Sequence, residues 1–206
     1  MIYLDYNATT PVDDRVVEAM LPYLRGHYGN PSSLHRQGRL ARAAVDQARE
    51  QVASLVNAHP AQVIFTSGGT EANNLAIKGV CHGGAPAALV IGATEHSSVL
   101  GPAARLAQAG WPVRQVPVDE LGRVTAQAVA DACRDGARLV SIMMANNETG
   151  VIHDVAAIAA AARAAGAVFH TDAVQAAGKI PVDFAASGAQ LMTLSAHRLC
   201  GANGVG

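Results

Sequence analysis

Polar residues of the kinds that hold phosphates and planar rings occur in short stretches of this sequence, each directly after a run of β-forming residues. The last and densest stretch is Leu194–Gly201, where Ser195, His197 and Arg198 stand together at the mouth of a turn. The five stretches begin at Ser67, Thr94, Asn146, Asp172 and Ser195. Because ligands bind at the carboxyl ends of parallel strands, these polar strand ends predict one shared ligand pocket.

The stretch after residues 63–66 has the features of a phosphate site. Gly69 and Thr70 open a predicted helix whose first N–H groups are free, and Thr70 adds a hydroxyl. The stretch matches neither a Walker A loop nor the GxGxxG pattern. Taken alone, such a stretch is more often an ordinary glycine turn before a helix. Taken with Ser195, His197 and Arg198, it predicts a cradle for an anion.

His96 and Asp172 supply groups that a planar, nitrogen-containing ring needs. His96 stands at a predicted helix start, where its imidazole could lie over a ring. Asp172 ends an apolar strand, and a carboxylate is costly to bury there unless it is paired. Such a carboxylate could hold a protonated ring nitrogen. Each residue also has a structural interpretation, as a satisfied histidine or as a helix N-cap aspartate.

Asn147 and Gln175 add side-chain amides at two of the strand ends, where they suit an exocyclic oxygen. An anion cradle, a stacking group, a carboxylate and these amides together describe a pocket for an aromatic phosphate. Pyridoxal phosphate fits that set. No zinc or iron–sulfur ligand spacing occurs in the sequence, so no metal is expected.

The elements that must position these residues alternate along the chain. Short aliphatic or β-branched runs, typical of buried strands, lie at 63–66, 88–91, 113–116, 139–143, 168–171 and 191–194. Segments with helical periodicity lie at 16–24, 34–57, 72–81, 99–109, 125–134 and 155–165. This alternation predicts an α/β fold, a mostly parallel sheet with helices on both faces. Residues 201–206 form a glycine-rich turn that enters what looks like another strand.

Composition narrows the class of protein. The 206 residues suffice for one α/β domain, and the formal net charge of -1 gives no reason to expect nucleic acid as a partner. No apolar run approaches the ~18 residues that span a bilayer, so no membrane is expected either. The three cysteines (Cys81, Cys133 and Cys200) form no CxxC pair and cannot all pair together. We therefore expect a reduced, cytoplasmic location.

The chain resembles the NifS/IscS cysteine desulfurases of the class V aminotransferase group, which are pyridoxal phosphate enzymes of fold type I. The resemblance rests on the stretches YLDYNATTPVD, GNPSSLHRQG, VIFTSGGTEANNLAIKG, ATEHSSV, VSIMMANNETGVI, FHTDAVQAAGKIPVD and LSAHRLCGANGVG. These stretches cover nearly the whole chain in the family's order. The implied domain is the cofactor-binding large domain, over residues 1–206, without the small C-terminal domain.

The resemblance also implies residue roles. His96 is implied as the catalytic, ring-stacking histidine, and Arg198 stands at the position of the family's Schiff-base lysine. Implied cofactor-binding residues are Gly69, Thr70, His96, Asn147, Asp172, Gln175, Ser195 and His197. Implied substrate-binding residues are Ala8, Thr9 and Asn147.

The implied parent reaction converts L-cysteine to L-alanine and leaves the sulfur on an enzyme cysteine as a persulfide. The family is dimeric, so a homodimer or pairing with a full-length homologue is implied. A sulfur acceptor or iron–sulfur scaffold protein is implied as the partner that receives the sulfur. The alternatives that share this half of the fold are a selenocysteine lyase and another class V lyase.

Two departures from the family predict impaired activity. Arg198 replaces the lysine, and an arginine keeps its proton, so it cannot form the covalent link or move the α-proton. The region that carries the family's persulfide cysteine also lies beyond the point where this sequence stops, and Cys200 lies in a turn without the reach of a mobile loop. We expect pyridoxal phosphate to bind without a covalent bond. A non-catalytic binding subunit and a gene fragment remain as alternatives.

Overall fold

A sheet of five parallel strands lies at the centre of the computed structural model, which describes residues 2–206. The strands are β1 (Leu89–Gly92), β2 (Val113–Val116), β3 (Leu139–Ser141), β4 (Val168–Asp172) and β5 (Leu191–Thr193). Their order across the sheet is β2-β1-β3-β4-β5, and every neighbouring pair is parallel. The expected parallel α/β fold is therefore confirmed.

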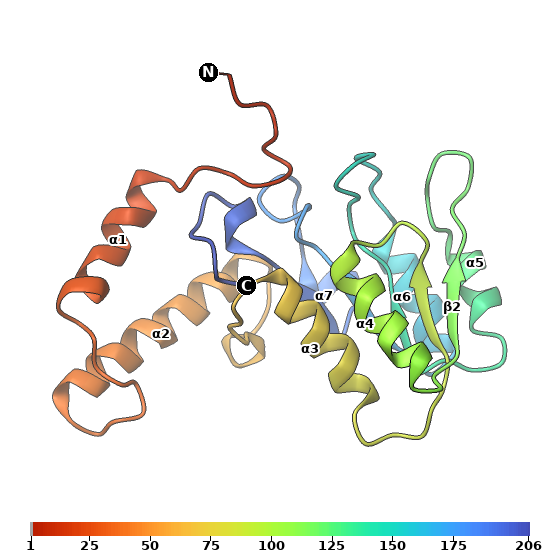
Figure 1. Cartoon of the computed structure of the whole chain (residues 1–206), viewed down its shortest axis with the longest axis horizontal. Helices are drawn as coiled ribbons and strands as arrows, with labels where there is room; N and C mark the ends of the chain where they lie inside the picture. The colour runs from red at the N-terminus through yellow and green to blue at the C-terminus, as the bar shows by residue number, and fades with distance from the viewer. Residues whose placement is uncertain (1) are drawn as a thin grey trace.

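Helices cover both faces of the sheet, as the alternating sequence predicts (Figure 1). The helices are α1 (Asp14–Arg25), α2 (Arg36–Leu55), α3 (Gly69–Cys81), α4 (Ser97–Gln108), α5 (Ala126–Ala132), α6 (Val155–Ala164) and α7 (Phe184–Ser187), with 3₁₀ turns η1 (Pro60–Gln62) and η2 (Ala196–Arg198). Leu89 and Ile91 of β1 pack against α3 and α4, whereas Val90 faces α5 and α6. This division follows from the alternation of side chains along a strand.

Local sequence signals set the ends of these helices. Asp154 caps α6 by accepting a hydrogen bond from the Ala157 backbone N–H, and Gly166 follows the helix in the left-handed region at φ 71°. Gly110 likewise follows the C-terminal end of α4 in the left-handed region, at φ 89°. Both stops are the ones that the sequence predicts, because glycine enters this region without a Cβ penalty.

The expected strand at residues 63–66 is wrong. The backbone there is extended, but it pairs with no strand of the sheet. The Thr66 N–H donates to the Gly206 carbonyl (2.7 Å), and the Gly206 N–H donates back to the Thr66 carbonyl (3.0 Å). An apolar cavity of about 600 Å³ lies between this segment and β5. The segment has a strand's composition, yet no sheet neighbour lies within hydrogen-bonding distance of it.

Residues 201–206 bring the chain to that contact without forming a strand of their own. The expected glycine-rich turn is present around Asn203 and Gly204, where φ of Gly204 is 87°. Within this segment, the reciprocal pair between Gly206 and Thr66 has the hydrogen-bond pattern of antiparallel strands. The expectation of a further strand is therefore not met within the described residues.

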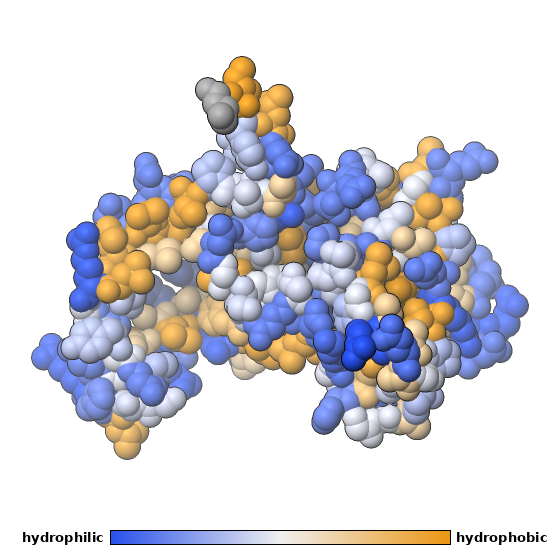
Figure 2. All heavy atoms as spheres, viewed as in Figure 1, coloured by the Kyte–Doolittle hydropathy of each residue, from blue (hydrophilic) through white to orange (hydrophobic). Residues whose placement is uncertain are grey.

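The N-terminal part of the chain packs least well. Helix α1 has no buried residue, and it projects away from the sheet beside α2 (Figure 1). Its apolar side chains include Met20 and Leu24, and Leu24 is 72% exposed. Hydrophobic residues gather on this side of the molecule in Figure 2. Among residues 2–206, no helix combines the length and apolar character that crossing a membrane requires.

Candidate functional site

A polar cavity of about 310 Å³ opens at the carboxyl ends of the strands. The predicted cofactor residues all line it: Gly69, Thr70, His96, Asn147, Asp172, Gln175, Ser195 and His197, together with Arg198. Its volume lies within the ~300–1,000 Å³ that small-ligand sites occupy. Stretches that lie far apart in the sequence therefore meet in one place, as expected of residues at the carboxyl ends of parallel strands. The role of each residue stays a prediction.

One end of the cavity suits an anion. Helix α3 starts there without a side-chain cap, because its N-cap is Gly68 at φ 151°. Its first N–H groups are therefore available to a ligand. The Ser195 hydroxyl, on a residue that is 3% exposed, has no hydrogen-bond partner among the described residues. A Cβ on Gly69 would lie 3.3 Å from a Val174 methyl group, which is tight, and 3.4 Å from the Ser195 Cβ, which is an ordinary contact.

Asp172 is held in the cavity by a short network that the sequence argument missed in part. One carboxylate oxygen accepts a hydrogen bond from the Asn73 side-chain amide (2.7 Å), and the other accepts the Val174 backbone N–H (3.0 Å). The Asn73 amide also donates to the Ser98 hydroxyl (2.8 Å). The two donors fix the orientation of the carboxylate where Asp172 lines the cavity. A carboxylate oxygen has more than one lone pair, so a carboxylate held in this way can accept a further hydrogen bond from a ligand.

A signal for Asn73 was present in the sequence. The buried residues of α3 are Asn73, Ile77 and Cys81, at a spacing of four residues. A polar residue in such an apolar stripe is costly to bury without a partner. The stripe therefore predicts that Asn73 reaches a polar group below the helix, and that group is Asp172.

His96 is both a helix cap and a cavity residue, so the two interpretations from sequence coexist. It is the N-cap of α4, and its Nδ1 accepts the Ser98 backbone N–H (3.2 Å) and lies 2.7 Å from the Ser98 hydroxyl. An Nδ1 that accepts a hydrogen bond leaves the proton of the neutral ring on Nε2. The cap thus fixes the tautomer and the orientation of the imidazole at the rim of the cavity.

A buried acid, Glu95, lies next to His96 in sequence and was also missed. Its Oε1 accepts the Met143 backbone N–H (2.7 Å), and the residue is 5% exposed. Burial raises the pKa of Glu95 well above its usual value, the Met143 N–H lowers it, and the charge of Asp172 raises it. Glu95 is therefore neutral over a wider pH range than an exposed glutamate.

Gln175 is engaged by the chain itself. Its Nε2 donates to the Asn7 carbonyl (3.1 Å), and its Oε1 accepts from Lys179 Nζ (2.6 Å), which also donates to the Asn7 side chain (2.9 Å). Burial lowers the pKa of Lys179, and the positive charge of Arg198 lowers it further. The predicted contact of Gln175 with a ring oxygen would thus compete with these partners.

The segment Ala8–Thr10 lies behind η2 and does not line the cavity. Thr10 donates two hydrogen bonds to the His197 carbonyl, from its backbone N–H (3.0 Å) and its hydroxyl (2.8 Å). The Thr9 hydroxyl lies 3.2 Å from His197 Nδ1. This segment therefore positions His197 in the structure, and the substrate role predicted for Ala8 and Thr9 stays a prediction.

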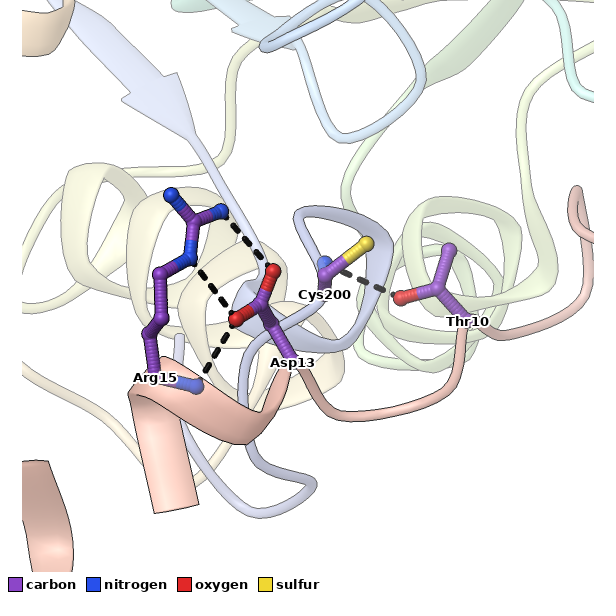
Figure 3. Close-up of polar contacts among 4 residues, drawn as sticks. All are labelled: Thr10, Asp13, Arg15 and Cys200. Atoms are coloured by element: carbon purple, nitrogen blue, oxygen red, sulfur yellow. Dashed lines mark hydrogen bonds and ion pairs between the residues drawn. The ribbon is translucent and has the colours of Figure 1, made fainter. Parts of the chain in front are cut away.

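Cys200 continues the same contact, as Figure 3 shows. Its backbone N–H donates to the Thr10 hydroxyl (3.0 Å), and its carbonyl accepts the Asp13 N–H (2.9 Å). Hydrogen bonds from Arg15 in turn lower the pKa of Asp13 to about 2. The Cys200 thiol is exposed, but its backbone is tied at two points, as befits a residue in a fixed turn.

Arg198 is the least satisfied residue of the cavity. Its Nε and Nη1 atoms are buried and have no hydrogen-bond partner among the described residues. Burial lowers the pKa of the guanidinium, while the charges of Asp5 and Asp172 raise it. Because arginine keeps its proton at all ordinary pH values, its donors require an acceptor. A buried donor without one costs about 1–3 kcal/mol, and more when it is charged.

Two parts of the cavity fit pyridoxal phosphate, whereas position 198 does not allow covalent attachment. The orphaned Ser195 hydroxyl and the free start of α3 suit the phosphate, and Asp172 suits the ring nitrogen. Arg198 cannot act as a Schiff-base residue. Within residues 2–206, no cluster of His, Cys, Asp and Glu side chains could hold a metal ion.

Comparisons with known proteins agree with this geometry. The cysteine desulfurases IscS of Colwellia psychrerythraea and of Shewanella loihica are each 46% identical over 210 residues, which cover 100% of this chain and 52% of the relative. The chain thus spans about half the length of these curated relatives.

Solved structures show the same likeness. A structure of SspA in complex with cysteine matches with a TM-score of 0.96 at 34% identity, over 100% of this chain and 60% of that one. A NifS-like protein matches with a TM-score of 0.94 at 37% identity, over 99% of this chain and 57% of the other. The profile of the class-V aminotransferases matches residues 2–206, and the chain belongs to that family.

Proposed function

We propose that this chain is the cofactor-binding part of a cysteine desulfurase-like protein and that it holds pyridoxal phosphate without a covalent bond. The observation that supports this most strongly is the cavity itself. It combines an uncapped helix start, an orphaned hydroxyl and a hydrogen-bonded carboxylate, on Gly69, Ser195 and Asp172. Those groups match a phosphate at one end of a ligand and a basic ring nitrogen elsewhere.

The proposed roles follow from what each group can do. The start of α3 with Thr70 and Ser195 holds the phosphate, and Asp172 keeps the ring nitrogen protonated. His96 lies over the ring and exchanges protons through Nε2. Pyridoxal phosphate, when bound in this way, supplies an electron sink for bond cleavage next to an amino group. The protein's part is to bind, orient and polarise it.

Cysteine is the proposed substrate of the parent activity, because the relatives are cysteine desulfurases and one solved neighbour is a complex with cysteine. The parent reaction would yield L-alanine and pass sulfur to an enzyme cysteine and then to an acceptor or iron–sulfur scaffold protein. We propose that this chain is impaired in that reaction, because Arg198 supplies neither the covalent link nor a proton-accepting amine.

A homodimer, or pairing with a full-length homologue, is proposed on the exposed apolar surface of α1. That helix buries no residue, and Leu24 is 72% exposed. Contiguous exposed apolar surface of this kind marks interaction sites in proteins. A cytoplasmic location is proposed with it, since the cysteines of the described residues are all free thiols.

Equilibrium dialysis against pyridoxal phosphate tests the binding proposal. Asp172→Asn keeps the size of the side chain but removes its charge, and the loss of a charged hydrogen bond of ~1.5–3 kcal/mol weakens binding by at least about tenfold. The matched control is Asp154→Asn, at the N-cap of α6, where asparagine caps equally well. This control should bind as the wild type does.

Two results would contradict the proposal. The first is a folded wild-type chain that does not retain pyridoxal phosphate at millimolar concentration. The second is an Asp172→Asn chain that retains it as well as the Asp154→Asn control. A far-ultraviolet circular dichroism spectrum of each variant shows whether it is folded before its binding is compared.

A further inference from the structure

Arg198 has an unmet requirement for an anion. Its Nε and Nη1 atoms are buried without a hydrogen-bond partner, and among residues 2–206 it forms no ion pair. Arg198 is the last residue of η2, and its side chain lines the polar cavity. A guanidinium presents its donors as a planar fork that matches a carboxylate with two parallel hydrogen bonds.

The carboxylates that line the cavity are engaged elsewhere in the chain. Both oxygens of Asp172 accept hydrogen bonds, from Asn73 and from the Val174 backbone. Glu71 Oε2 accepts two hydrogen bonds from Ser67, one from the backbone and one from the hydroxyl. Neither carboxylate forms an ion pair with Arg198 among the described residues, so the cavity leaves room for a ligand to supply that anion.

The phosphate of the proposed cofactor already has another place. The uncapped start of α3 and the orphaned Ser195 hydroxyl form one anion site. Arg198 forms a second, because it stands at the position that the family resemblance assigns to the Schiff-base lysine, away from the start of α3. One cavity thus has two anion requirements, a tetrahedral one and a planar one.

We propose that Arg198 makes this pocket selective for a pyridine phosphate that carries a carboxylate, in preference to the aldehyde or amine forms of the same ring. This inference rests on the proposed function, since it assumes that the ring binds between Asp172 and the start of α3. The carboxylate has two possible sources: the ring itself, as in the 4-carboxylate that is the oxidised form of the aldehyde, or an amino acid joined to the ring.

The two alternatives to the carboxylate are worse partners for Arg198. An aldehyde offers one neutral oxygen, whereas a carboxylate offers two charged ones, and charge-assisted hydrogen bonds are about twice as strong as neutral ones. An amine at the same position is protonated and repels the guanidinium. Lys179 adds a second positive charge close by, which favours an anion further.

Isothermal titration of the folded chain with four probes tests this inference. The probes are pyridoxal phosphate, pyridoxamine phosphate, 4-pyridoxic acid phosphate and the reduced adduct phosphopyridoxyl-alanine. We expect the better of the two carboxylate probes to bind at least about tenfold more tightly than pyridoxamine phosphate, a difference of ~1.4 kcal/mol. Tighter binding of the adduct assigns the carboxylate to an amino acid, and tighter binding of the ring acid assigns it to the ring.

Arg198→Met keeps a long side chain and removes the guanidinium fork. The ratio of the affinity for the better carboxylate probe to the affinity for pyridoxamine phosphate should then fall to about one, while pyridoxamine phosphate binds as well as it does to the wild type, or better. Arg105→Met, at an exposed arginine of α4 outside the cavity, is the matched control and should keep the wild-type ratio. Equal affinities for all four probes in the wild type, or a preference that survives in Arg198→Met, would overturn this inference alone. Failure of all four probes to bind would overturn the proposed function with it.

Discussion

Two cavities share Ser195 in their linings, and they differ in volume and in the polarity of their other lining residues. The larger, of about 600 Å³, lies between residues 63–66 and β5 and is lined mainly by apolar side chains such as Phe65 and Leu75. The smaller, of about 310 Å³, lies at the strand ends and contains Asp172 and Arg198. Apart from Ser195, the larger cavity has no buried side-chain polar atom without a partner among the described residues, and the Thr66 hydroxyl beside it donates to the Gly68 carbonyl (3.1 Å).

Unmet hydrogen bonds, rather than volume, distinguish the candidate ligand site. The apolar cavity lies where β5 has no neighbouring strand on its outer edge, and its lining offers a ligand few polar partners. The smaller cavity holds a fixed carboxylate, an orphaned hydroxyl and an orphaned guanidinium. Those groups specify a ligand with a ring nitrogen and anionic substituents.

The largest expected effect contrasts the core beside the sheet with the wall of the apolar cavity. Phe169 of β4 is fully buried in the core between the sheet and helices α5 and α6, so Phe169→Ala should cost about 3–5 kcal/mol of unfolding free energy. Phe65 borders the apolar cavity at 36% exposure, under the Arg49 guanidinium, so Phe65→Ala should cost less than ~1.5 kcal/mol. Urea unfolding measures both. Equal losses would mean that the wall of the apolar cavity is packed as tightly as the core.

The next largest expected effect is a dependence of stability on pH that originates at His170 of β4. His170 is fully buried between the Ser141 hydroxyl (2.8 Å) and the Thr193 hydroxyl (3.0 Å). Burial lowers its pKa to about 4, although Asp172 acts in the opposite direction. The unfolded chain takes up the proton near pH 6.5 and the folded chain does not. Stability is therefore lost as the pH falls from about 6.5 toward 4, by up to ~3 kcal/mol.

Unfolding free energies at pH 7 and pH 5 check this sign. His170→Gln keeps a donor and an acceptor but does not titrate, so its stability should change less between the two pH values than that of the wild type. If both chains lose the same amount, His170 does not carry the effect.

A substitution at Ser195 should have a smaller effect on stability, and its effect on ligand affinity shows which of the two cavities binds the ligand. Its hydroxyl stabilises nothing in the chain, so Ser195→Ala should change stability by less than ~0.5 kcal/mol but weaken a phosphate ligand by about tenfold. Leu75→Gln, in the apolar cavity, should leave that affinity unchanged. Dialysis with pyridoxal phosphate compares them. A larger loss for Leu75→Gln would place the ligand in the other cavity.

Much of this fold was predictable because its elements follow local patterns. β2 has the predicted bounds, and the other sheet strands differ from theirs by one or two residues. Residues 63–66 have the same aliphatic pattern and yet form no sheet strand, because strand formation also requires a partner. Composition alone does not contain that information.

The site was predictable to the same extent. Strand-end logic brought His96, Asp172 and Ser195 together, because parallel strands share one carboxyl edge. It missed Asn73 and Glu95, which act from a helix face and from beneath the cavity. Their contacts depend on how helices lie on the sheet, and spacing along the chain does not fix that.

We propose that the polar cavity holds pyridoxal phosphate and that Arg198 prevents a covalent bond to it. The most direct measurement is borohydride reduction of the wild type and of Arg198→Lys in the presence of pyridoxal phosphate, followed by mass spectrometry of the intact chain and its peptides. We expect a covalently held cofactor at position 198 in the lysine variant and none in the wild type. Stoichiometric attachment in the wild type, at Lys179 or elsewhere, would contradict it.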